Sequence, residues 1–173
     1  MGKSGSGQTE TRPVESVLKE ARLRHVCRSA FVLAGRRTPL REVIHNLQAA
    51  EAGVVLVTEQ DGKLAGVFTE RDYLDKVALK QGRSPGGLDP HTQVEALMTP
   101  SPRTLSAEHT LSDAIRVMTE GGYRHIPLVE ADGRIVGVLS ANDAVHYIAE
   151  HFPAEVFNLP PHLHQRIRSR EGG

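Results

Sequence analysis

Two short segments of the chain place a hydroxyl and a carboxylate in the same order after a glycine. Each contains glycine, two apolar residues, serine or threonine, two variable residues and aspartate: GVFTERD at 66–72 and GVLSAND at 137–143. Where a strand passes into a helix, this spacing predicts a capping box, in which hydroxyl and carboxylate bind each other's backbone amides. The side chains concerned are Thr69 and Asp72 in the first segment and Ser140 and Asp143 in the second.

The same residue types also suit a nucleotide. A strand-to-helix junction presents free N–H groups and the positive end of the helix dipole, which favour phosphate. A carboxylate there repels phosphate, but it can accept two hydrogen bonds from the adjacent hydroxyls of a ribose. The glycine that opens each segment lets a ligand approach the backbone closely. Capping alone explains one such segment, whereas its recurrence at equivalent positions of a repeat favours a binding role.

The chain contains that repeat. A shift of 71 positions superimposes residues 38–78 on 109–149 without a gap, with nine identities in 41 pairs. Many other pairs keep their residue type, for example Glu42 with Asp113 and Leu64 with Ile135. A repeat of this length predicts two copies of one supersecondary unit, each too small to close its own core. The two copies are therefore expected to pack on each other.

Each copy predicts the same order of elements. Each copy opens with an amphipathic helix whose apolar stripe starts at Leu40 or Leu111. Thr38 is expected to cap the first helix, with Pro39 at the first helical position, and Thr110 with Asp113 is expected to cap the second. A hairpin and a second helix follow in each copy: 54–57, 64–68 and 73–81 in the first, and 126–129, 135–139 and 144–152 in the second. Apolar stretches at 30–34 and 101–105 are candidate extra strands. The unit is β-α-β-β-α, twice, which is an α+β fold built from α/β-type repeats.

Composition excludes several classes of protein. The 173 residues include 21 Lys plus Arg and 21 Asp plus Glu, so the formal net charge is zero. This balance disfavours nucleic acid and anionic membranes as partners. No apolar run approaches the roughly 20 residues of a membrane span, and with one cysteine, Cys27, the chain is expected to be cytoplasmic. The nine histidines lack the spacing of a metal site, so no metal is expected.

The motifs resemble those of a tandem pair of cystathionine-β-synthase (CBS) domains, known as a Bateman module. The resemblance covers residues 24–150, and its most specific pieces are GVFTERD, GVLSAND, ALMTP at 96–100 and YRHIPLV at 123–129. It implies two pseudo-symmetric repeats with two clefts that bind AMP, ADP, ATP or S-adenosylmethionine as a regulatory ligand. No cofactor is required, a homodimer is expected, and the regulated protein is unknown. The implied organisation is a disordered tail at 1–13, a lead helix at 14–24, CBS domains at 25–82 and 94–151, a linker at 83–93 and a C-terminal tail at 152–173.

The resemblance also assigns residues to the two clefts. It implies that Asp72 and Asp143 hold ribose, with the neighbouring hydroxyl beside them, and that a basic pair, Arg124 and His125, contacts phosphate. The first copy has Arg71 in place of that pair, so the second cleft is predicted to suit an anionic nucleotide better. The implied sets are Thr69, Asp72, Thr99 and Pro100 for the first cleft, and Ser140, Asp143, Cys27 and Ser29 for the second.

Three alternatives remain open on these residues. Arg124 and His125 could simply begin an exposed strand, and the chain could be a dimerising scaffold whose clefts are vestigial. A hydrolase is a third alternative, but no Ser-His-Asp or Cys-His order falls on a recognisable catalytic turn. We therefore expect a regulatory module rather than an enzyme.

Overall fold

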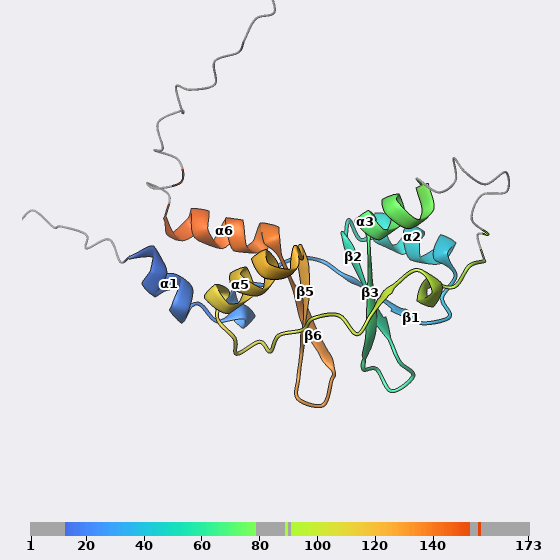
Figure 1. Ribbon diagram of the computed structural model, residues 1–173, viewed down its shortest axis with the longest axis horizontal. Helices are drawn as coiled ribbons and strands as arrows, with labels where there is room; N and C mark the ends of the chain where they lie inside the picture. The colour runs from blue at the N-terminus through green and yellow to red at the C-terminus, as the bar shows by residue number, and fades with distance from the viewer. Residues whose placement is uncertain (1–12, 79–88, 90, 153–155, 157–173) are drawn as a thin grey trace, which may run out of the picture.

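The computed structural model describes residues 13–78, 89, 91–152 and 156. Two lobes lie side by side, and each carries a β-hairpin that points the same way (Figure 1). The first lobe contains β1 (Val32–Gly35), α2 (Leu40–Ala49), β2 (Val54–Thr58), β3 (Leu64–Thr69), α3 (Glu70–Tyr73) and β4 (Thr99–Pro100). The second contains α1 (Val14–Glu20), α5 (Leu111–Gly121), β5 (His125–Val129), β6 (Ile135–Ser140) and α6 (Ala141–His151). The predicted α+β fold with two repeats is confirmed.

The two sheets differ in size. The first has the order β1-β2-β3-β4, with β1 parallel to β2 and the other neighbours antiparallel. The second consists of the antiparallel pair β5-β6, and its counterpart of β1 is reduced to a single parallel bridge from Leu105 to Leu128. A strand over residues 101–105 was expected, but in that stretch Leu105 alone makes a bridge. The chain instead forms a short strand just before it, at Thr99–Pro100, where it pairs with β3.

Two of the expected helix ends also differ. Pro39 has an extended backbone, so α2 begins at Leu40 and the side chain of Thr38 does not cap it. The Leu40 amide instead donates to the Thr92 carbonyl at 2.8 Å, which removes the need for a side-chain cap. The helix expected at 73–81 begins earlier, as α3, and continues as a π-helical turn over Leu74–Ala78. Residues 79–81 lie outside the described part of the chain.

The segment that precedes each repeat packs on the other repeat. The 3-10 turn Leu23–His25 joins the core of the second lobe, and the turn Val94–Ala96 joins that of the first. Leu23 and Val94 are fully buried there and are related by the 71-residue shift. Equivalent backbone bonds hold both turns: Leu23 N to His109 O and Leu111 N to Ala21 O on one side, and Val94 N to Thr38 O and Leu40 N to Thr92 O on the other. The lead helix expected at 14–24 ends at Glu20, where this exchange begins.

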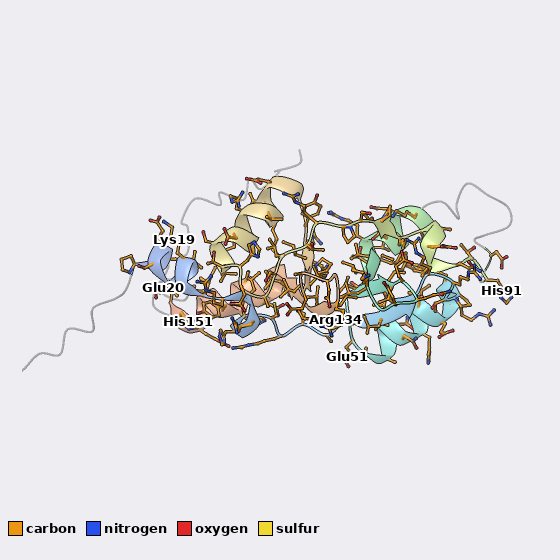
Figure 2. The ribbon with its side chains drawn as sticks, turned by 90° about the horizontal axis from the view of Figure 1, so that it is seen from below. Lys19, Glu20, Glu51, His91, Arg134 and His151 are labelled. Carbon is orange, nitrogen blue, oxygen red and sulfur yellow. The ribbon has the colours of Figure 1, made fainter. Side chains whose placement is uncertain are left out.

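A third apolar cluster joins the lobes. Val54 and Leu56 from β2 pack with Val138 from β6, and all three are buried. Nearby, the two hairpin tips meet in a bridge between Lys63 and Arg134. Figure 2 shows Arg134 at the boundary between the lobes, with His91 at one far end of the molecule and Lys19 and His151 at the other. The two repeats pack on each other through this apolar seam, as the sequence predicts.

The predicted tails and linker lie largely outside the described residues. These are the tail at 1–13, the linker at 83–93 and the C-terminal tail at 152–173, of which the structure describes Pro13, Asp89, residues 91–93, Phe152 and Val156. Among the helices of the described ranges, none is long and apolar enough to cross a membrane.

Candidate functional site

A cleft of about 340 Å³ lies between the two repeats. Its first wall is the end of β3 and the start of α3, together with the chain that follows β4. Its second wall is the loop between α5 and β5. The lining residues are Gly53, Val67, Thr69, Glu70, Arg71, Asp72, Thr99, Ser101, Pro102, Arg103, Gly122, Tyr123, Arg124 and His125.

Asp72 is fixed at this cleft by a complete capping box. Its Oδ2 accepts from the Thr69 amide at 3.0 Å and from the Thr69 hydroxyl at 2.8 Å, and the Asp72 amide donates to Thr69 Oγ1 at 3.3 Å. The other oxygen, Oδ1, lies 2.6 Å from Lys76 Nζ. Lys76 follows Asp72 by one helical turn, so the i, i+4 spacing could have indicated this pair from the sequence. The capping interpretation is therefore confirmed at Asp72, and the carboxylate also faces the cleft.

Three arginines, Arg71, Arg103 and Arg124, line the same cleft. Within the described part of the chain, none of them forms an ion pair with a carboxylate. The acidic residues of the lining are Glu70 and Asp72, and Asp72 is already paired with Lys76. The cleft thus holds an excess of unpaired positive charge, which is the chemistry of an anion site.

His125 extends from the second repeat to the first. A Cβ added at Gly53 would lie 3.3 Å from His125 Nε2, so the missing side chain at Gly53 makes room for the imidazole. Burial lowers the pKa of His125; the Asp143 and Glu70 carboxylates oppose this, and the Arg124 guanidinium adds to it. Neutral at pH 7, this imidazole can donate one hydrogen bond into the cleft without adding a charge.

The depressed pKa of His125 predicts a loss of stability in acid. Its folded-state pKa lies below the ordinary value of 6.5, so the unfolded chain takes up this proton first as the pH falls. The His125 contribution is therefore complete above about pH 6.5 and is lost below it. We expect urea unfolding to show a weaker loss of stability from pH 7 to pH 5 in His125→Gln than in the parent. Identical pH profiles for the two proteins would contradict this assignment.

The structure corrects the predicted pairing of the basic residues. Arg124 and His125 were assigned to the second cleft because they belong to the second repeat, but they line the cleft of Asp72. β5 starts at the interface between the lobes, so the residues at its start face the first repeat. The prediction that Arg124 and His125 belong to the second cleft is therefore wrong. Arg103 lies in the stretch expected to be a strand, and its place in the cleft was not predicted from the sequence.

Among the residues assigned to the second cleft, Ser140 and Asp143 are buried, whereas Cys27 and Ser29 are half-buried. Ser140 and Asp143 make the expected capping box, with Ser140 N to Asp143 Oδ2 at 2.8 Å and Asp143 N to Ser140 Oγ at 3.0 Å. Ser29 bonds to both side chains. Burial and, to a lesser extent, the Asp143 charge raise the pKa of the Cys27 thiol to about 12, so this thiol stays protonated at neutral pH.

The remaining predicted contacts divide between these two places. Thr99 lines the cleft of Asp72, whereas the neighbouring Pro100 lies outside its lining and pairs with Gly66 in the first sheet. Among the described residues, no group of three His, Cys, Asp or Glu side chains is arranged to hold a metal ion.

The comparisons agree with the repeat and the fold. The CBS domain family matches residues 11–79 and 94–150, so the chain belongs to that family. CBSX3, a mitochondrial CBS domain-containing protein of Arabidopsis thaliana, is 32% identical over 121 residues, or 69% of this chain and 54% of that protein. A second relative, from Acidianus ambivalens, is 24% identical over 60% of this chain. The chain spans between 14% and 58% of the length of the first curated relatives that it matches.

Solved structures share the architecture. The CBS-domain containing protein ATU1752 from Agrobacterium tumefaciens is 28% identical, covers 72% of this chain and 91% of its own, and superimposes with a TM-score of 0.61. CBSX2, solved in complex with AMP, is 22% identical, covers 75% of this chain and 97% of its own, and has the same TM-score of 0.61. At that identity the second likeness establishes the fold, which is the tandem CBS pair known as a Bateman module.

Proposed function

We propose that the chain is a regulatory module that binds an adenosine nucleotide in the cleft lined by Asp72. The observation that carries this proposal is the meeting of one ribose-compatible carboxylate with three unpaired guanidinium groups in a single cleft. Asp72 would accept hydrogen bonds from the ribose hydroxyls, displacing Lys76 from Oδ1. Arg71, Arg103 and Arg124 would bind the phosphates, with His125 beside them. The adenosine part is supported by the family and by fold neighbours solved with AMP and with S-adenosylmethionine.

The charge of the cleft favours a phosphorylated ligand over S-adenosylmethionine. That molecule carries a sulfonium and an ammonium group against a single carboxylate, and three unpaired arginines would repel this net positive charge. AMP, ADP and ATP instead gain charge-assisted hydrogen bonds from the same side chains. We therefore propose phosphate-bearing nucleotides as the ligand class, with affinity rising with the number of phosphates.

Regulation requires that binding change the population of two states of the module. Nucleotide bridges the two repeats in this cleft, so it favours whichever arrangement brings Asp72 and Arg124 to the bound distance.

We also propose that the chain self-associates, and two exposed apolar residues support this. Leu74 and Val145 are related by the 71-residue shift and are 55% and 62% exposed. They place matching apolar contacts at equivalent positions of the two repeats.

The Asp72→Asn variant tests the ribose contact. It keeps a hydrogen-bonding group in the capping box but loses the charge that strengthens bonds to ribose, so ATP affinity should fall at least about tenfold. Asp113→Asn is the matched control, because Thr110 and Asp113 form the same box outside the cleft. There Asp113 Oδ2 accepts from the Thr110 amide at 3.0 Å and from the Thr110 hydroxyl at 2.7 Å. Calorimetric titration with ATP should show the loss in Asp72→Asn alone. Equal affinities in both variants would make Asp72 a helix cap that does not contact ribose, whereas a parent that binds no ATP would favour the scaffold alternative.

A further inference from the structure

The cluster at Ser140 and Asp143 is the counterpart of the cleft at Thr69 and Asp72, but a distant segment of the chain occupies its carboxylate, whereas Asp72 Oδ1 is paired with Lys76, four residues further along the chain. Ser140 and Asp143 are each only 5% exposed. Asp143 Oδ2 accepts from the Ser140 amide at 2.8 Å, and Oδ1 bonds to the Ser29 hydroxyl at 3.0 Å. The same Ser29 Oγ lies 2.7 Å from Ser140 Oγ. One hydroxyl from a distant segment therefore contacts both side chains that the motif would offer to a ribose.

The segment that carries Ser29 is anchored at two places just before this residue. Before it, Leu23 and Val26 are buried in the core of the second repeat, at 0% and 1% exposure. Next to it, both terminal nitrogens of Arg28 bond to the Glu150 carboxylate on α6, at 2.6 and 2.9 Å. This exposed ion pair adds little stability, but its two parallel bonds fix the direction of the segment. The apolar burial of Leu23 and Val26 is the main force that holds Ser29 in place.

The equivalent segment at Asp72 cannot make this contact. The 71-residue shift relates Ser29 to Pro100, which has no hydroxyl. Pro100 pairs with Gly66 in the sheet, and a Cβ at Gly66 would lie 2.6 Å from Met98 Sδ and 2.9 Å from the Thr99 carbonyl oxygen. A Cβ at Gly137, the counterpart of Gly66, would meet nothing within 4 Å. The chain thus packs against the backbone at Gly66, whereas at the second junction it reaches the capping side chains through Ser29.

We propose that the Ser29 hydroxyl takes the place of a ribose hydroxyl at Asp143, so that each chain binds one nucleotide, at Asp72, and not two. The stoichiometry rests on the function proposed above, whereas the Ser29 contact does not. In this assignment Asp143 stabilises the fold and Asp72 binds the ligand. The duplicated motif has separated into one structural and one binding copy.

Two measurements on the full chain test the proposal. Titration with ATP should give one site per chain, and Asp143→Asn should leave the stoichiometry at one and the affinity within twofold of the parent. Without ligand, Ser29→Ala and Asp143→Asn should each lower the urea midpoint of unfolding. The double variant should lower it by less than the sum of the two single changes, because both changes disturb the Ser29–Asp143 bond.

The opposite results are distinct. Two ATP sites per parent chain, or a lost site in Asp143→Asn, would overturn the assignment of Asp143 to the fold. Additive losses in the ligand-free series would overturn the Ser29 contact. A parent that binds no ATP would overturn the proposed function and the stoichiometry together, and the ligand-free series would still decide whether Ser29 and Asp143 are coupled.

Discussion

Arg124→Ala is expected to weaken the binding of ATP and AMP while leaving adenosine affinity unchanged. The guanidinium lines the cleft without a carboxylate partner among the described residues, so it is free to bind phosphate. Loss of hydrogen bonds between charged groups costs about 1.5–3 kcal/mol, which corresponds to roughly 10- to 150-fold in affinity. Calorimetric titration of parent and variant with adenosine, AMP and ATP measures the effect.

Arg116→Ala serves as the control for this variant. Arg116 lies on α5 outside the cleft, where its side chain is 62% exposed and its carboxylate neighbours lie at 3.8 and 3.9 Å. Its removal should not change the affinity for any of the three ligands. An equal loss of adenosine and ATP affinity in Arg124→Ala would show that Arg124 supports the shape of the cleft and does not bind phosphate.

Leu23→Ala is expected to lower the free energy of unfolding by about 2–5 kcal/mol, because it leaves a cavity in a packed core. Leu23 is fully buried between elements of the second repeat, although it lies in the segment before the first. Urea unfolding measures the change. Leu33→Ala is the matched control, since Leu33 lies on β1 and is 57% exposed, and it should change stability by less than about 1 kcal/mol. Similar losses in the two variants would place Leu23 outside the core.

Much of the fold was predictable because local patterns determine it. The hairpins, the apolar stripes of α2 and α5 and the capping boxes at Thr69, Thr110 and Ser140 all follow from spacing within about ten residues. Thr38 is an exception. Threonine followed by proline favours a helix cap, but the Leu40 amide at the start of α2 donates to the Thr92 carbonyl instead. A contact over more than 50 residues of sequence leaves no local signal.

Most residues of the cleft could be named from the sequence, but two of them were assigned to the other cleft. The motif residues Thr69, Asp72 and Arg71 line the cleft as the resemblance implied, and Arg124 and His125 line it with them. Their assignment to the other cleft followed from their position in the chain, whereas a site between repeats takes its walls from both. Arg103 could not be predicted because it belongs to no motif. The resemblance predicts Ser29 as a ligand contact, but its hydroxyl is bonded to the Asp143 carboxylate, which was the predicted ribose acceptor of the second cleft.

The exchange of lead segments makes the two repeats a single cooperative unit. Residues 21–26 complete the second core and residues 92–97 complete the first, so neither half can unfold without exposing apolar surface of the other. Contacts that join residue 23 to residue 109 and residue 21 to residue 111 raise the contact order, which slows the search for the native state. The same contacts place the cleft across the seam of this unit. Energy gained there by a ligand is therefore distributed over the whole chain, and a nucleotide would raise one common melting temperature rather than that of one lobe.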